Sequence, residues 1–327
     1  MHCIVQLLEQ GYRVRGTLRT PSRAAGLREA FARHVDAADR LDFVTADLMR
    51  DDGWAEAVAG CTYVMHIASP VPRKLPRHEN DLIIPAREGT RRVLQAAADA
   101  QVKRVVMTSS VAAVCYGHDS DSGRVFDETD WSDTSQDIGP YPKSKTLAER
   151  DAWEFVENHP ALELAVINPA MVLGPLLDAR YTTSIEIVLK LMNRDAPGCP
   201  NIGWSFVDVR DVAAAHLAAM TIPEATGQRF ICSHEFAWLQ DIARILHDHF
   251  AHRGFNIPRR KLPDIVLRFF ALFDETARLS IDYLGARTDY SNARITSVLN
   301  WQPHSLPEMV IATGESLIEH GIVQASR

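Results

Sequence analysis

The feature that most restricts the fold is an alternation of short apolar runs with longer amphipathic segments in the first half of the chain. Apolar runs cover residues 41–48, 63–70, 105–110 and 162–167, and residues 80–100 carry apolar side chains at helical spacing. Short runs of this kind indicate buried strands, and strands that alternate with helices indicate a sheet covered on both faces. The sequence therefore predicts an α/β fold with a doubly wound parallel sheet.

A pair of serines follows one of these apolar runs. Ser109 and Ser110 end the run that begins at Val105. The carboxyl ends of parallel strands form the edge at which doubly wound sheets bind ligands. A serine hydroxyl at this edge is able to hold the oxygen of a substrate carbonyl. We therefore expect one of these serines in a ligand site.

Tyr141 and Lys145 stand at the start of a predicted helix. Pro140 and Pro142 are typical of a first helical turn, and an apolar face follows from Leu147. Residues four apart share one helix face, about 5–6 Å apart at Cβ. An ammonium group beside a phenol lowers the phenol pKa, so we expect Tyr141 to act as a general acid to a carbonyl or a base to an alcohol. The alternative is a chance pairing, because this spacing alone is common.

Four segments, in this order, resemble the extended short-chain dehydrogenases/reductases. They are the serine run at 105–110, the Tyr141-x-x-x-Lys145 pair, Val-Ile-Asn-Pro-Ala-Met-Val-Leu-Gly-Pro at 166–175, and Trp-Ser-Phe-Val-Asp-Val-Arg-Asp-Val-Ala at 204–213. Within this family the chain is most similar to the dihydroflavonol reductase, cinnamoyl-CoA reductase and aldehyde or methylglyoxal reductase group. The resemblance covers nearly the whole chain, and it implies NADPH-dependent reduction of an aldehyde or ketone to an alcohol by hydride transfer.

The same resemblance implies the domain organisation. A Rossmann-type NADP-binding domain is expected at residues 1–172, and a smaller α/β lobe that mainly binds substrate at 173–327. From Leu176 the regular alternation of strands and helices weakens. Segments 206–208 and 229–231 are expected to return to the sheet of the first domain.

The resemblance also implies roles for individual residues. Ser110, rather than Ser109, hydrogen-bonds the carbonyl oxygen, and Tyr141 gives that oxygen its proton. Lys145 lowers the pKa of the phenol and, like Tyr141, contacts the cofactor, where it holds the nicotinamide ribose. The other residues implied in cofactor binding are Asp47 and Leu48 beside the adenine, Ala68 and Ser69 in the cofactor channel, and Pro169 against the nicotinamide. Asp47 would alternatively cap the helix predicted over residues 51–58.

Arg19 bears on the choice of cofactor. It ends the strand predicted over residues 12–19, and Arg23 follows it. Dinucleotide folds place an acidic residue at this strand end to hold a free ribose 2′-hydroxyl, and an arginine to hold a 2′-phosphate. Arginine without a carboxylate therefore favours NADPH over NADH. The alternative is that both arginines are merely solvated.

The sequence begins inside a predicted helix. Residues 1–11 have the pattern of an amphipathic helix closed by Gly11. In the family that the chain resembles, a first strand and a T-G-x-x-G-x-x-G turn precede this helix, and the glycines let backbone N–H groups approach the cofactor pyrophosphate. Both are absent from the sequence, so we expect a sheet without its first, central strand. A start codon assigned too late is the preferred hypothesis, and a shortened protein that binds cofactor poorly is the alternative.

Cys115 bears on the substrate. Plant flavonoid reductases of this family carry an asparagine at this place that helps to hold the flavonoid, so the resemblance favours small aldehydes, 2-oxoaldehydes and ketones here. Two other functions stay open. An NAD-dependent sugar-nucleotide epimerase or dehydratase would use the same Ser110, Tyr141 and Lys145, whereas a truncated, non-catalytic cofactor-sensing protein would need none of them.

Composition argues against other classes of function. A net charge of −7 gives no basic field for nucleic acid or an anionic membrane. No apolar run approaches the roughly 20 residues of a membrane span. The five cysteines are scattered without a C-x-x-C pair, and the histidines at 247, 249 and 252 spread around a helix, so no metal site is expected. We expect a cytoplasmic monomer or homodimer that binds a small carbonyl substrate.

Overall fold

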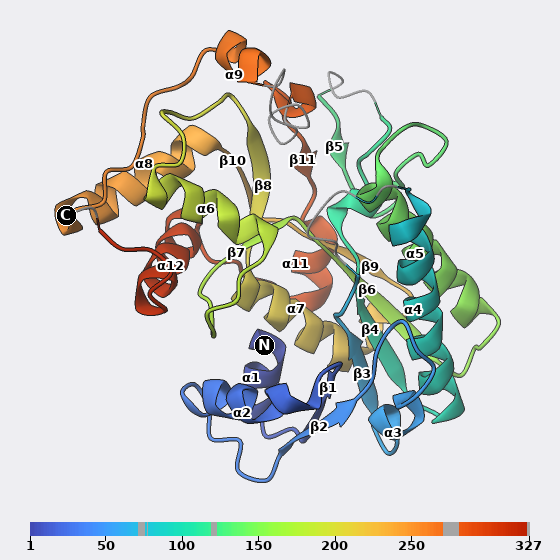
Figure 1. Cartoon of the computed structure of the whole chain (residues 1–327). Coiled ribbons are helices and arrows are strands. Elements are labelled where there is room, and N and C mark those ends of the chain that lie inside the picture. Colours follow the sequence, from blue (N-terminus) through green and yellow to red (C-terminus); the bar gives the residue numbers. More distant parts are fainter. Residues whose placement is uncertain (71–75, 77, 119–122, 271–280, 326–327) are drawn as a thin grey trace.

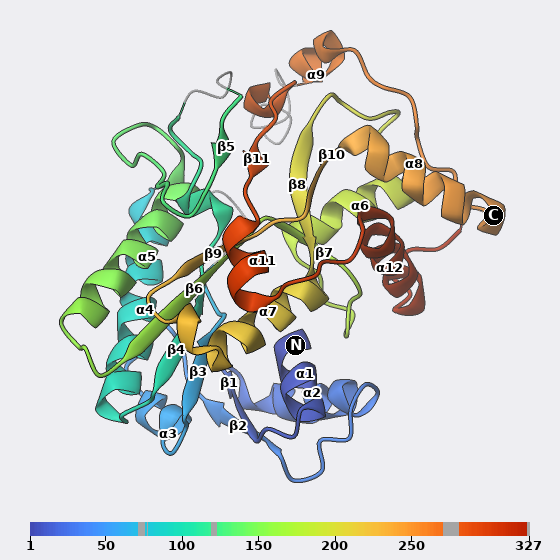
Figure 2. The same ribbon diagram turned by 180° about the vertical axis from the view of Figure 1, so that it is seen from behind.

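The computed structural model describes residues 1–70, 76, 78–118, 123–270 and 281–325. Figures 1 and 2 show a parallel sheet with helices on both of its faces, and beside it a smaller lobe built mainly from the second half of the chain. The α/β architecture is that expected from the sequence.

The central sheet contains four parallel strands in the order β3-β4-β6-β9. They are β3 (Tyr63–His66), β4 (Arg104–Thr108), β6 (Glu163–Pro169) and β9 (Arg229–Cys232). The return of residues 229–231 to the first sheet is therefore confirmed.

Alternate residues of the central strands pack on opposite faces of this sheet, as the strand period of two requires. Val105 and Leu164, which are register partners, lie in one buried cluster, whereas the next partners, Val106 and Ala165, lie in another. Both faces are therefore apolar, which explains why these strands are continuous apolar runs in the sequence. The helices on the first face are α4 (Asn80–Asp99) and α5 (Pro140–Glu157), and those on the second are α7 (Val209–Thr221) and α11 (Ala293–Leu299).

The N-terminal part forms a separate piece of sheet. Helix α1 (His2–Glu9) leads to β1 (Val14–Leu18), which pairs in parallel with β2 (Leu41–Thr45). Within the described residues, β1 pairs only with β2, and β3 only with β4, so the two pieces share no strand hydrogen bonds. Helix α1 joins them instead, because Cys3 packs with Ala213 and Leu217 of α7. The shorter elements of this part are η1 (Pro21–Arg23), α2 (Ala24–Ala32) and α3 (Trp54–Val58).

The second lobe has a sheet of its own in the order β10-β8-β7. The prediction that 206–208 return to the first sheet is wrong, because β8 (Gly203–Asp208) pairs with β7 (Met171–Leu173) and β10 (Glu235–Trp238). The chain leaves the first sheet at Pro169, whose missing N–H ends the ladder, and it re-enters a sheet two residues later as β7. Helices α6 (Thr183–Asn193), α8 (Leu239–Phe250) and α12 (Leu306–Glu319) share the core of this lobe.

Shorter elements complete the described chain. Strand β5 (Val125–Phe126) pairs in parallel with β11 (Asp289–Tyr290), and α9 (Asp264–Phe270) lies at the outer end of the second lobe. Single turns lie at η2 (Val111–Ala113), η4 (Pro223–Ala225), η5 (Ala251–Arg253) and η6 (Ile281–Tyr283). None of the described helices combines the length and the apolar character needed to cross a membrane.

A buried arginine anchors α7 to the sheet. Arg104 is 2% exposed, and its guanidinium donates to Glu163 Oε2 at 2.7 Å, to Ala219 O at 2.8 Å and to Ile222 O at 2.6 Å. The last carbonyls of a helix have no partners within the helix, so this cation satisfies acceptors that would otherwise be orphaned at the end of α7.

We expect Arg104→Met to destabilise the fold by roughly 2–4 kcal/mol, because it leaves buried carbonyls unsatisfied and removes the partner of Glu163. Urea denaturation measures the change. Arg13→Met is the matched control, since the side chain of Arg13 is 72% exposed and its loss should cost at most about 0.5 kcal/mol. Equal midpoints for the two variants would contradict the assigned role.

Candidate active site

The start of α5 places Tyr141 and Lys145 on one face of the helix. Gly139 precedes the helix with φ of +78°, a conformation that suits glycine, and Pro140 occupies the first helical position. Tyr141 and Lys145 are then one turn apart, and Lys145 Nζ lies 5.9 Å from the centroid of the Tyr141 ring. The spacing predicted from the sequence is therefore present.

Ser110 reaches the same place from the carboxyl end of β4. Its backbone is extended, its Oγ accepts from Ala112 N at 3.1 Å, and its hydroxyl is close enough to the Tyr141 phenol to act on the pKa of that phenol. Ser109 is 3% exposed, and its Oγ has no partner among the described residues. The structure thus brings Ser110, and not Ser109, to the phenol.

Two opposing effects act on the pKa of Tyr141. Desolvation raises the pKa of the phenol, and the neighbouring Ser110 hydroxyl opposes the rise. Desolvation is the larger effect, so the net shift of the phenol pKa is upward, and the lowering effect of Lys145 stays a prediction. Tyr141 therefore holds its proton at neutral pH, which suits the donor of a proton better than a base.

Lys145 is a buried cation. It is 7% exposed, and its Nζ makes no hydrogen bond or ion pair with the described residues. Burial lowers its pKa to about 8, and the nearby carboxylate of Glu149 opposes that shift. An ammonium group with unused donors is suited to the hydroxyls of a ribose. The nicotinamide end of a dinucleotide therefore fits this part of the site.

The other predicted cofactor residues follow the carboxyl ends of several strands. Arg19 follows β1 and is exposed. Ala68 and Ser69 follow β3, and Pro169 is the buried last residue of β6. Ala68, Ser69 and Pro169 thus lie at the carboxyl edge of the sheet that leads to Ser110, whereas Arg19 follows a strand of the N-terminal piece.

The remaining predicted pair, Asp47 and Leu48, follows β2 and is half-buried. Asp47 Oδ1 accepts from Met49 N at 3.0 Å, and its carbonyl accepts from the Trp54 indole at 3.2 Å. Asp47 therefore shapes a turn and does not cap α3, whose N-cap is Gly53. Leu48 packs against α4 beside Gly89.

A group of phenols beside Tyr141 was missed by the sequence reasoning. The hydroxyls of Tyr116 and Tyr283 are 3.2 Å apart, and Tyr290 donates to Cys115 Sγ at 3.1 Å. Burial raises the pKa of Tyr116 well above its ordinary value, with smaller contributions from Tyr283, Cys115 and Tyr141. Cys115 follows the serine motif closely, and this was a usable signal, but nothing local pairs residue 116 with residue 283.

Asp208, Asp211 and His304 offer ligand atoms within 4.8 Å of one another, but other groups already use them. Arg210 donates to both oxygens of Asp208, through Nε at 2.9 Å and Nη2 at 2.7 Å, and His304 bonds both oxygens of Asp211. A guanidinium in this position opposes a second cation. Asp208 also caps α7, because its side chain accepts from Arg210 N.

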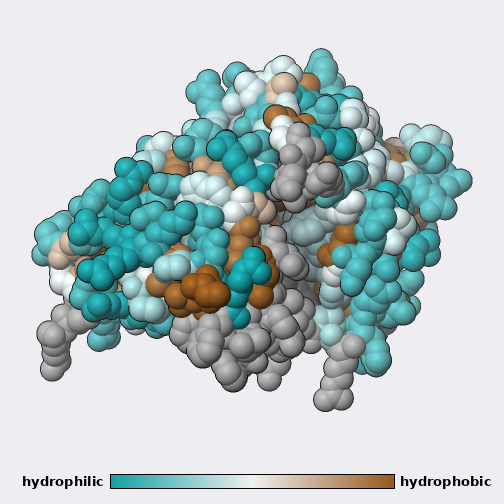
Figure 3. Space-filling model, turned by 90° about the horizontal axis from the view of Figure 1, so that it is seen from above, coloured by the Kyte–Doolittle hydropathy of each residue, from teal (hydrophilic) through white to brown (hydrophobic). Residues whose placement is uncertain are grey.

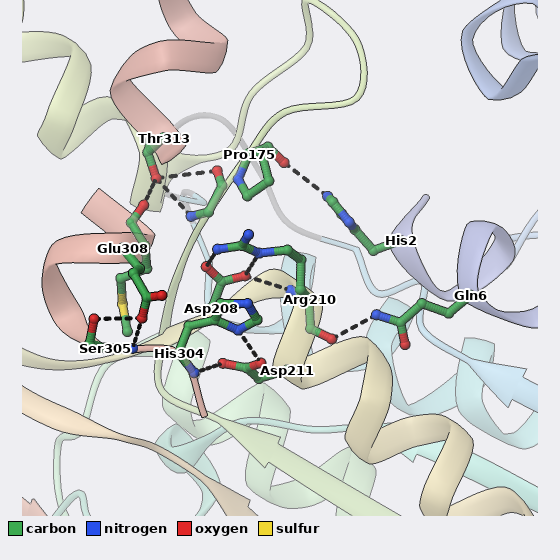
Figure 4. A network of polar contacts seen from close by, with 12 residues as sticks. His2, Gln6, Pro175, Asp208, Arg210, Asp211, His304, Ser305, Glu308 and Thr313 are labelled. Carbon is green, nitrogen blue, oxygen red and sulfur yellow. Dashed lines mark hydrogen bonds and ion pairs between the residues drawn. The ribbon is translucent and has the colours of Figure 1, made fainter. Parts of the chain in front are cut away.

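Figure 4 shows what this group connects. His2 Nε2 lies 2.9 Å from Pro175 O, and Gln6 donates to Arg210 O at 2.9 Å, so α1 is tied to the exit of β7 and to α7. On the other side of the cluster, Thr313 Oγ1 of α12 accepts a hydrogen bond from Gly174 N at 2.7 Å. The cluster is therefore a structural junction of α1, α7 and α12.

Two surface hollows in the described part of the chain lie elsewhere. One lies in the second lobe beside Trp238 and Lys261, and the other lies between α4 and α5 beside Arg91 and Phe155. Neither includes a predicted catalytic residue. Figure 3 shows that the upper side of the molecule is largely hydrophilic, with its apolar residues in small groups. The candidate site is therefore located by the contacts among its side chains, and not by either of these two hollows.

We expect Lys145→Met to raise the free energy of unfolding at pH 7 by roughly 1–3 kcal/mol, because it removes a desolvated charge. The folded pKa of Lys145, about 8, lies below its ordinary value of 10.5. Between these two pKa values the unfolded wild type binds more protons than the folded wild type, so the stability of the wild type rises with pH. The stability advantage of Lys145→Met therefore shrinks as the pH rises. Denaturation at pH 7 and at pH 10 tests this. Lys143→Met, which loses an ion pair with Glu79 near the surface, is the control and should give no gain.

Known proteins resemble this chain over most of its length. The model of the NAD dependent epimerase/dehydratase family matches residues 1–232. Cinnamoyl-CoA reductase 1 of Petunia hybrida is 39% identical over 249 residues, which are 75% of this chain and 72% of that protein. Tetraketide alpha-pyrone reductase 2 of Arabidopsis thaliana is 35% identical over 266 residues, 78% of this chain and 80% of that protein.

A solved structure resembles the whole fold. Yeast methylglyoxal/isovaleraldehyde reductase Gre2, in its complex with NADPH, superposes with a TM-score of 0.81 at 28% identity and covers 98% of this chain and 96% of its own. The sequence motifs, the family match and the shared fold all point to the same protein family. The chain belongs to the NAD dependent epimerase/dehydratase family, that of the extended short-chain dehydrogenases/reductases.

Proposed function

We propose that this chain reduces the carbonyl group of a small aldehyde or ketone to an alcohol with NADPH as the reductant. The observation that carries the proposal is the convergence of three side chains: the Ser110 hydroxyl acts on the pKa of the Tyr141 phenol, and Lys145 Nζ lies 5.9 Å from the centroid of the Tyr141 ring. A serine, a phenol and an ammonium group thus converge where a carbonyl oxygen can be held and protonated.

Each residue has a separate task. NADPH, when bound, supplies the hydride. Ser110 hydrogen-bonds the carbonyl oxygen and orients it toward Tyr141. Tyr141 gives its proton to that oxygen, and its raised pKa keeps this proton in place until negative charge develops on the substrate. Lys145 holds the nicotinamide ribose, and its positive charge favours the phenolate that proton transfer leaves behind.

The choice of NADPH is supported by Arg19 and by a relative. Arg19 is exposed after β1, where an arginine is suited to a 2′-phosphate. Yeast Gre2, whose fold this chain shares, forms a complex with NADPH. In our proposal Asp47 and Leu48 flank the adenine, Ala68 and Ser69 line the channel, and Pro169 packs against the nicotinamide.

The tyrosines beside Tyr141 determine the chemical properties of the substrate side of the site. Tyr116, Tyr283 and Tyr290 place aromatic rings and hydroxyls near Tyr141, which suits a small carbonyl compound with an apolar part. We further propose the cytoplasm as the compartment, since all five cysteines are free. A monomer or homodimer is the expected assembly.

We expect Tyr141→Phe to bind NADPH with nearly unchanged affinity while its turnover falls by at least about 10³-fold, because only the transferable proton is removed. Quenching of tryptophan fluorescence during an NADPH titration measures binding. A screen of small aldehydes, 2-oxoaldehydes and ketones that follows NADPH absorbance measures turnover. Near-normal turnover in this variant would remove Tyr141 from the role, and a wild-type chain with no NADPH binding would contradict the proposed function.

We expect Arg19→Ala to weaken NADPH binding by about tenfold or more and to leave NADH binding unchanged, because a charge-assisted contact to the 2′-phosphate is lost. Parallel titrations with both cofactors give the ratio of affinities. Arg13→Ala removes an arginine before the same strand, where it pairs with Asp39, and should leave that ratio alone. An equal loss for both cofactors would exclude a 2′-phosphate contact.

A further inference from the structure

Glu149 is a buried carboxylate outside the predicted catalytic group. It is 0% exposed and lies on α5, one turn after Lys145. Its Oε1 accepts from Arg229 Nε at 2.6 Å, and its Oε2 accepts from Asn168 Nδ2 at 2.8 Å. A carboxylate of this kind is retained only where it is well paired, so its partners show what it holds in place.

Asn168 connects this carboxylate to the catalytic serine. The same Nδ2 that donates to Glu149 also donates to the main-chain oxygen of Ser110 at 3.1 Å. Both partners are acceptors, so the amide is held with its NH₂ toward them. Asn168 Oδ1 is consequently buried without a partner among the described residues. An acceptor left unpaired in this way is unfavourable, so the orientation of the amide is set by its two donated bonds.

Arg229 fixes the other side of the network. Its Nη1 donates to Asp130 O at 2.6 Å and to Glu128 O at 3.2 Å, and its guanidinium lies 3.8 Å from the centroid of the Trp131 ring. The loop before α5 and the carboxylate on α5 are therefore held by one buried cation. Glu149 cannot move without breaking these contacts.

We propose that Asn168 and Glu149 are positioning residues for the carbonyl reduction: the Asn168 amide fixes the main chain of Ser110 against α5, and the Glu149 carboxylate supplies the negative charge that faces Lys145. This inference rests on the proposed function. The titratable groups that act on Lys145 are Glu149, with Tyr141 on the same helix and His66 of β3 beside it. Burial lowers the pKa of His66 to about 4, so this imidazole is neutral when Lys145 titrates.

The two residues predict different kinetic signatures. Asn168→Leu leaves the Ser110 main-chain oxygen with the bond from Ala113 N at 2.9 Å but removes its link to α5, so kcat should fall by roughly 10- to 100-fold while the KM for NADPH changes little. Glu149→Gln removes the charge that opposes the lowered pKa of Lys145. The alkaline fall of kcat should then move to lower pH by on the order of one unit. A merely structural role would not move the pH profile.

Trp153→Phe is the matched control. Trp153 Nε1 donates to the same carboxylate oxygen as Arg229, at 3.4 Å, and does not contact Asn168. Its loss removes a hydrogen bond to Glu149 but leaves the bridge to Ser110. This variant should keep wild-type kcat and pH profile, with circular dichroism melts checking all variants for folding. If Asn168→Leu does not fold, Asn168→Ser carries the same expectation.

Two measurements without turnover separate this proposal from the proposed function. Hydrogen exchange followed by mass spectrometry should show faster exchange at residues 109–116 in Asn168→Leu but not in Trp153→Phe. Acylation of Lys145 at a series of pH values should show that this lysine becomes reactive at a lower pH in Glu149→Gln than in the wild type. An inactive wild type would refute the reductase and leave both measurements decisive. Exchange and acylation identical to those of wild type would overturn the positioning roles.

Discussion

The buried ion pair between Glu149 and Arg229 is the contact on which the arrangement of the site depends. It joins α5, which carries Tyr141 and Lys145, to β9, which enters the sheet only after the chain has passed through β7, α6 and β8 of the second lobe. The desolvation of two such charges is costly, and their pairing contributes little net stability, so its main physical effect is to fix one geometry. The active edge of the first sheet therefore becomes complete only when the chain has returned from the second lobe.

The elements of the first half could be predicted because their signals are local. Apolar runs marked β3, β4 and β6, and prolines marked the start of α5. The partner of β8 could not be predicted in the same way, since β7 has only three residues and emerges directly after the proline that ends β6. Strand pairing between segments far apart in sequence depends on tertiary packing, which a local pattern does not encode.

The candidate site shows the same division. The spacing of Tyr141 and Lys145 and the place of Ser110 after a strand follow from sequence periodicity. The pKa of Tyr141 does not, because the sequence shows the neighbouring lysine but not the burial that dominates. Glu149 and Arg229 escaped notice for a related reason: a charged residue within a helix or strand is expected on the surface, and only a partner 80 positions away makes it a buried one.

The N-terminal helix α1 contacts several elements that lie far apart in the sequence. The two pieces of parallel sheet have no strand pairing in the described residues, so side chains join them: those of α1 pack on α7, and Val44 of β2 shares a cluster with Val64 of β3. His2 and Gln6 extend this connection to the junction around Asp208 and Asp211. At this boundary side-chain packing therefore replaces the ladder of backbone hydrogen bonds that holds the other strands of the first sheet together.

The buried cations of the described chain are of two kinds, those with hydrogen-bond acceptors and one without. Arg104 and Arg229 are both deeply buried, and each donates to several acceptors, as a structural cation must. Lys145 is equally buried, yet no described acceptor bonds its Nζ. The unpartnered Ser109 Oγ and Asn168 Oδ1 lie next to Ser110, at the same edge of the sheet. His247 Nδ1 and Asn292 Oδ1 are also buried without a partner among the described residues, so unsatisfied polar atoms alone do not locate the site; the contrast between Lys145 and the two buried arginines does so together with the motifs.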